Sequence, residues 1–257
     1  MSARLIGCGI GLLLAFGPAT SAQSGRGQRV AEAKPGEMRL LVTAAIRTPL
    51  DAVRAEAEQA IGRPLVIEYG SARGNLKQAI LAGQGFDVAM LLPDVDDELL
   101  KAGQIARAGV EIARVPIAIG VRGEVPSIDL STPEAVKQAM LNAKSLRWSP
   151  TGAALLTVNK MLDTLGIREA ATAKHNMPAP VPLGPGDYEL NIYPQSEILE
   201  NAALRNRGPV IAALQVPAII TAVVAADTKD VTAAKALIAF LQGPMLDPAL
   251  ETSGMSR

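Results

Sequence analysis

Cysteine is almost missing from this sequence, which contains a single one, Cys8, among 257 residues. One cysteine cannot form an intramolecular disulfide or complete a zinc-thiolate site, so neither device holds this chain together. Aromatic residues are also scarce, at 3% of the composition. This scarcity argues against a base-stacking surface and against a sugar-binding cleft floored by tryptophan. We therefore expect a ligand without a large apolar face.

Net charge is a second absence, since 25 lysines and arginines balance 25 aspartates and glutamates. The chain has no overall field to attract nucleic acid or an acidic membrane, so we expect no nucleic-acid partner. Any selectivity for anions must come from local groups.

The parts of an enzyme are sparse as well. His175 is the one histidine, and no Gly-x-Ser-x-Gly elbow accompanies it, so we expect it to be a surface residue and predict no catalytic residues. The acidic run of Asp94, Asp96, Asp97 and Glu98 is typical of the solvated first turn of a helix, so we predict no metal site and no cofactor.

Hydrophobic residues make up 49% of the chain, enough for one large core or two smaller ones. A basic start at Arg4, an apolar run over 5–16 and the small residues Thr20, Ser21 and Ala22 predict a secretory signal peptide, residues 1–22. The alternative, a membrane anchor, requires a run of roughly 20 residues. We expect a periplasmic protein with a flexible leader at 23–37.

From residue 38 onward the pattern alternates strand and helix, which predicts an α/β fold with mainly parallel sheets flanked by helices. Two β-prone stretches, 111–121 and 216–226, are too long for ordinary strands, and we interpret them as crossovers that form a hinge between two lobes. Lobe 1 is then built from 38–115 and 216–257, and lobe 2 from 116–215. The alternative is one continuous sheet with two long strands.

Four loops follow predicted strands and contain small polar residues: 43–48, 70–75, 149–152 and 193–196. Helix N-termini in such loops offer free N–H groups and a partial positive charge, and hydroxyls add further donors. Several of them together can bind an anion without a lysine or arginine. The alternative is that these serines and threonines only cap helices.

At these loops the chain resembles a known family. The segments Leu41-Val42-Thr43-Ala44-Ala45, Tyr69-Gly70-Ser71, Leu81-Ala82-Gly83-Gln84-Gly85-Phe86-Asp87-Val88 and Gln195-Ser196-Glu197-Ile198-Leu199 are similar to the molybdate-binding, ModA-like proteins of ABC importers. The resemblance implies a two-lobed type 2 periplasmic binding fold that holds an oxyanion and delivers it to an inner-membrane permease. We expect a monomer, which suits a diffusing carrier. The candidate ligand-binding residues are Ala45, Ile46, Ser71, Ala72, Arg73, Ser149, Thr151, Gly152, Tyr193 and Gln195.

Two departures from the family pattern leave other ligands open. Ile46 stands where molybdate binders carry a serine, and it cannot donate a hydrogen bond. Arg47 follows it, and Arg73 lies in the second loop, so either arginine could pair with a carboxylate or phosphate; the alternative for both is a solvated rim. Trp148 lines the cleft or belongs to the core. A secreted enzyme and a sensor-linked binding protein stay as alternative functions.

Overall fold

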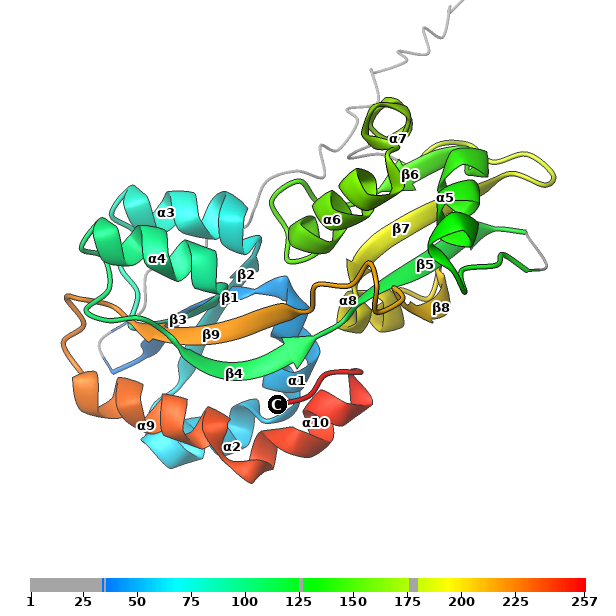
Figure 1. The fold of residues 1–257 in the computed structure, drawn as a ribbon. Helices are drawn as coiled ribbons and strands as arrows, with labels where there is room; N and C mark the ends of the chain where they lie inside the picture. Colours follow the sequence, from blue (N-terminus) through cyan, green and yellow to red (C-terminus); the bar gives the residue numbers. More distant parts are fainter. Residues whose placement is uncertain (1–33, 35, 125–126, 176–179) are drawn as a thin grey trace, which may run out of the picture.

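The computed structural model describes residues 34, 36–124, 127–175 and 180–257. The predicted signal peptide, residues 1–22, lies outside the described residues, as does the predicted leader except for Lys34, Gly36 and Glu37. Within the described ranges, no helix is long and apolar enough to cross a membrane. These ranges form two lobes, each with its own β-sheet and helices (Figure 1).

Lobe 1 contains a five-stranded sheet with the order β2-β1-β3-β9-β4. The strands are β1 (Met38–Thr43), β2 (Leu65–Gly70), β3 (Val88–Leu91), β4 (Val110–Val115) and β9 (Ala218–Val224). The helical elements are η1 (Ala44–Ile46), α1 (Arg47–Ala52), α2 (Arg54–Ile61), η2 (Ala72–Leu76), α3 (Lys77–Leu81), α4 (Pro93–Lys101), α9 (Val231–Gln242), η3 (Pro244–Leu246) and α10 (Asp247–Thr252). Helices α3 and α4 cover one face of the sheet, and α2, α9 and α10 lie on the other (Figure 1). Because both faces are covered, β3 is buried along its whole length.

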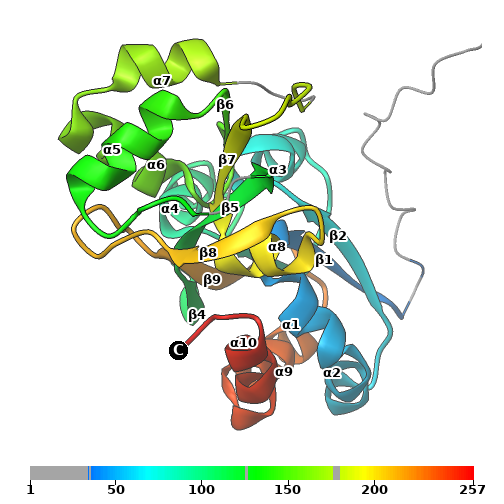
Figure 2. The same cartoon turned by 90° about the vertical axis from the view of Figure 1, so that its right-hand side faces the viewer.

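Lobe 2 contains a four-stranded sheet with the order β6-β7-β5-β8. Its strands are β5 (Ile117–Gly123), β6 (Ser145–Arg147), β7 (Tyr188–Pro194) and β8 (Arg205–Pro209), and its helices are α5 (Pro133–Asn142), α6 (Leu155–Leu165), α7 (Arg168–Lys174) and α8 (Gln195–Glu200). Thr132 caps α5, because its side chain accepts a hydrogen bond from the Ala135 N–H at 3.1 Å. Figure 2 shows α8 on the side of this sheet that faces α1.

The chain passes between the lobes at two neighbouring places. Strand β4 ends at Val115 in the first sheet, and β5 begins at Ile117 in the second, with Pro116 between them. The returning segment lies beside this crossing, because the Gln215 side chain accepts from the Ile117 N–H at 3.0 Å and donates to the Ile117 carbonyl at 2.9 Å. The Gln215 carboxamide therefore satisfies the backbone N–H and carbonyl of Ile117 in the way that a neighbouring strand would.

The strand directions correct one part of the prediction, although the two-lobed α/β fold itself is confirmed. Both sheets are mixed: β1 pairs with β2 and β3 in parallel, but β9 is antiparallel to β3 and β4. In lobe 2, β5 is antiparallel to both of its neighbours. The physical reason is that β4 carries the chain out of lobe 1 and β9 carries it back, so adjacent connecting strands run in opposite directions.

Candidate ligand-binding site

The four predicted loops line one cavity between the lobes, with a volume of about 90 Å³. We call it the head cavity. Its lining residues are Thr43, Ala44, Gly70, Ser71, Ser149, Gly152, Ala153, Ala154, Tyr193, Pro194 and Glu197. A water molecule occupies about 30 Å³ of the liquid, so the head cavity has room for about three waters.

The parallel pairs in each sheet explain why these loops meet. Strands β1 and β2 end together, with Thr43 opposite Gly70, so the loops that follow them lie side by side. In lobe 2, β6 and β7 are also parallel, which brings the loop at Ser149 close to Tyr193. The carboxyl ends of both pairs face the cleft, the usual position for ligands of open α/β sheets.

The N-terminus of α6 is the clearest anion-binding feature of the cavity. Gly152, Ala153 and Ala154 precede this eleven-residue helix and line the head cavity. No described residue accepts a hydrogen bond from the Ala153 or Ala154 N–H. Free amides at the positive end of a helix dipole favour a negatively charged ligand.

The hydroxyl groups of Ser71 and Ser149, which line the cavity, differ in their hydrogen-bond partners. Ser71 Oγ donates to the Thr151 carbonyl at 2.6 Å and lies 2.8 Å from the Thr151 hydroxyl oxygen, so it links the two lobes. Ser149 Oγ accepts a 3.4 Å hydrogen bond from the Thr151 N–H, which leaves its own proton available to a ligand. Ser149 is therefore the better placed donor of the two.

Direct contacts between the loops show that the lobes are closed on each other. Besides the Ser71 bonds, the Arg73 N–H donates to the Thr151 carbonyl at 3.3 Å, and the Arg73 guanidinium donates to the Gly152 carbonyl at 2.8 Å. Nearer the hinge, Ser196 Oγ donates to the Ala45 carbonyl at 2.6 Å. The head cavity is thus formed only when both lobes meet.

Glu197 also lines the head cavity, although nothing in the sequence marks it as a candidate. Its side chain borders the head cavity and two adjoining spaces. Burial, and to a smaller extent the neighbouring Glu200, raise its pKa to about 7, although Arg47 acts in the opposite direction. A carboxyl group that is about half protonated near pH 7 can donate a hydrogen bond to an anion. The sequence offered only a glutamate in the first turn of a helix, which is an ordinary pattern.

Several predicted ligand residues lie elsewhere. Ala45, Ile46 and Ala72 are fully buried in the core of lobe 1 and do not line the head cavity. Ala44 and Thr43 occupy the position that the sequence assigned to Ala45 and Ile46. Strand β1 ends at Thr43, and the short helix η1 that follows turns Ala45 and Ile46 into the core.

The two candidate arginines also lie outside the head cavity. Arg73 forms a two-pronged ion pair with Asp94, at 2.6 and 2.9 Å, in addition to its bond with Gly152. Arg47 stacks on the Tyr69 ring, 4.7 Å from its centroid. The side chain of Gln195 lies against Gly254 near the C-terminus. Arg73 therefore joins the lobes, and neither arginine is positioned to hold the head of a ligand.

Two other sequence expectations are corrected. His175 is half-buried and stacked on Trp148, with ring centroids 3.8 Å apart, so it is not a free surface residue, and Trp148 belongs to the core. Asp96 is not solvated either: it is 3% exposed, and burial raises its pKa to about 6. Asp94, Asp97 and Glu98 are the exposed members of that run. No group of His, Cys, Asp and Glu suited to a metal ion occurs among the described residues.

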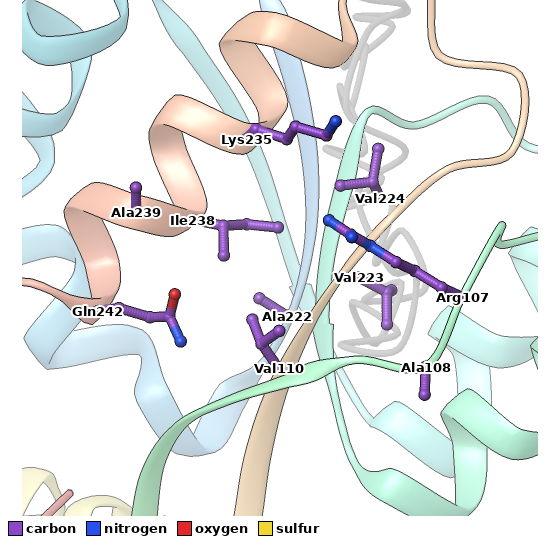
Figure 3. A pocket seen from close by; sticks show the side chains of 10 residues that line it. All are labelled: Arg107, Ala108, Val110, Ala222, Val223, Val224, Lys235, Ile238, Ala239 and Gln242. Carbon is purple, nitrogen blue, oxygen red and sulfur yellow. The ribbon is translucent and has the colours of Figure 1, made fainter.

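A separate crevice of about 160 Å³ lies in lobe 1 between α9 and strands β4 and β9 (Figure 3). Lys235 and Ile238 on α9 line one side, and Val110 and Val223 line the other. None of the four loops reaches this crevice, so it is not part of the interlobe site.

Comparison with known proteins identifies the family. The chain belongs to the bacterial extracellular solute-binding proteins, whose family profile matches residues 38–256. Among curated proteins it is similar to an aconitate isomerase from Pseudomonas sp, with 24% identity over 207 residues, 77% of this chain and 79% of that protein.

Solved structures show the same fold. The periplasmic molybdate-binding protein of Azotobacter vinelandii superimposes with a TM-score of 0.68 at 15% identity, covering 86% of this chain and 99% of that one. The sulfate-binding protein SubI of Mycobacterium tuberculosis gives a TM-score of 0.63 at 14% identity, covering 85% and 86%. These identities are low, so the likeness concerns the fold.

Proposed function

We propose that this protein captures a small oxyanion in the head cavity and delivers it from the periplasm to the permease of an ABC importer. The observation that carries the proposal is the cavity between the contacting lobes. It is lined by Ser149 and by Ala153 and Ala154, whose N–H groups have no acceptor among the described residues. Its size suits a single oxyanion head. The molybdate- and sulfate-binding proteins of the same fold support this choice.

A thermal-shift screen tests the proposal. Molybdate, tungstate, sulfate and phosphate are compared, because a ligand that binds only the native state stabilises it by about 2.7 kcal/mol at a concentration 100 times Kd. We expect at least one of these anions to raise Tm, and chloride at equal ionic strength to have no effect. The absence of a shift with any anion would contradict oxyanion capture.

Serine variants then locate the binding site. Ser149→Ala removes a donor to the ligand, and we expect it to weaken binding by about 1 kcal/mol or more. Ser71→Ala should have a similar effect by loosening the bonds to Thr151. Exposed Ser131→Ala is the matched control. Affinity is measured by calorimetry. If it is unchanged in both cavity variants, these serines have only local structural roles and do not bind the ligand.

Two observations favour a catalytic alternative: the half-buried, protonatable Glu197 beside the cavity and the similarity to an aconitate isomerase. A carboxyl with a pKa of about 7 is suited to exchange protons with a bound acid. The test is incubation with trans-aconitate followed by NMR. Conversion by the wild type and its loss in Glu197→Gln would establish an isomerase, and an unchanged substrate would leave capture as the function.

A further inference from the structure

Beside the head cavity lies a second space in lobe 2, of about 130 Å³. We call it the lobe 2 pocket. Its lining residues are Arg147, Asn191, Tyr193, Glu197, Ile198, Asn201 and Leu204. Tyr193 and Glu197 line both spaces, so the two adjoin. Together they have room for about seven waters, more than the four oxygens of a tetrahedral anion need.

Strand pairing explains the chemistry of this pocket. Asn191 and Tyr193 are two residues apart on β7, so their side chains lie on the same face of the sheet. Arg147 is directly opposite Asn191 on the parallel strand β6. The Arg147 guanidinium and the Asn191 carboxamide are therefore neighbours, and Tyr193 lies between them and the head cavity.

The charges around Arg147 favour an anion. Arg147 lies 3.7 Å from the carboxylate of Glu189, and Arg122 lies 3.1 Å from the same carboxylate. Glu189 is buried, with a side-chain exposure of 1%, so two arginines share one buried negative charge. Arg122, Arg147 and Glu189 together carry one positive charge, at a guanidinium with 15% exposure. Glu197 also lines the pocket and opposes this charge only in its ionised form. An arginine fork of this kind matches a carboxylate or phosphate in geometry and charge.

We infer that the natural ligand is a small organic anion with two acidic groups, one held in the head cavity and the other beside Arg147 and Asn191 in the lobe 2 pocket. This inference rests on the proposed function, since it takes the head cavity to be the first anion site. It gives the ligand class as a short dicarboxylate or phospho-carboxylate. From the sequence, Arg47 and Arg73 are possible partners for such a ligand. In this inference Arg147 takes that role instead.

The test uses matched pairs of probes in calorimetry: phosphoglycolate against inorganic phosphate, and succinate against acetate. In the wild type we expect at least one two-headed probe to bind tenfold or more tightly than its one-headed partner. In Arg147→Gln that gain should disappear, with the affinity for the one-headed probe changed by less than about threefold. Arg168→Gln, an exposed arginine paired with Asp163, is the control.

Each other outcome has a definite meaning. If inorganic anions bind and neither two-headed probe binds more tightly, the inference is wrong and oxyanion capture stands. If no probe binds at all, the proposed function fails with it. If Arg147→Gln does not fold, Asn201→Phe fills the pocket from its exposed rim and should remove the same gain. An equal loss for one-headed and two-headed probes would assign Arg147 a purely structural role.

Discussion

Gly74→Val should weaken ligand binding by about 100-fold or more, because it prevents the lobes from closing. A Cβ at Gly74 would lie 2.8 Å from the Thr151 hydroxyl across the cleft and 3.1 Å from Ser71. The valine methyl groups add bulk at this contact. With the lobes held apart, the ligand loses the Ser149 hydroxyl and the amides of α6, each worth about 1.5–3 kcal/mol when bonded to a charged group.

Calorimetry measures the affinity, and small-angle scattering measures closure. We expect the ligand to compact the wild type and to leave Gly74→Val at a larger radius of gyration. Gly85→Ala is the matched control, since a Cβ there meets nothing within 4 Å. Adding Thr151→Ala to Gly74→Val should recover part of the affinity by relieving the clash. A Gly74→Val protein that binds and compacts like the wild type would show that the loops do not meet in the bound state.

Sulfate binding should weaken as the pH rises above 7 and should lose this dependence in Glu197→Gln. The pKa of Glu197 is raised to about 7, so its carboxyl is mainly protonated below pH 7 and mainly ionised above it. The ionised form repels an anion in the head cavity, and the protonated form can donate to it. Affinity should therefore fall by up to about tenfold per pH unit above pH 7.

Sulfate is the suitable probe because it does not titrate in this range. At pH 8 Glu197→Gln should bind it about tenfold more tightly than the wild type, and at pH 6 about equally. Glu134→Gln, an exposed carboxyl on α5, controls for a general charge effect. Parallel pH profiles for the wild type and Glu197→Gln would rule out Glu197 as the titrating group.

The same shift links pH to stability. Because the folded pKa of Glu197 exceeds its ordinary value of 4.5, the native state holds a proton that the unfolded chain releases between about pH 4.5 and 7. The contribution of this group to the free energy of unfolding is therefore fully present below pH 4.5. It falls as the pH rises towards 7, by at most about 1.4 kcal/mol per pH unit. Above pH 7 its contribution is constant.

Much of the fold could be predicted because its signals are local. The alternation of apolar strands and capped helices depends only on neighbouring residues, as at Thr132, whose side chain caps α5 by accepting from the N–H of Ala135 three residues later. Strand direction could not be predicted in the same way. Whether β9 runs parallel or antiparallel to β3 depends on where the chain returns, which no residue of β9 encodes.

The site shows the same division. Placing the four loops at one edge follows from the rule for parallel strands, and the structure brings them together around the head cavity. The roles of single side chains depend on tertiary partners. The sequence makes Arg73 a candidate ligand residue, but in the structure its guanidinium pairs with Asp94, 21 positions further along the chain. Arg147 and Glu197 gave no signal, since an edge-strand arginine and a first-turn glutamate are common.

In the bound state that we propose, an anion occupies the head cavity between the closed lobes. A co-crystal structure with the anion that gives the largest thermal shift would show where that anion binds. We expect density for the anion within hydrogen-bonding distance of Ser149 Oγ and of the Ala153 or Ala154 N–H, with both lobes in contact with it. An anion bound elsewhere on the molecule, with the head cavity holding only solvent, would show that the head cavity is not the binding site.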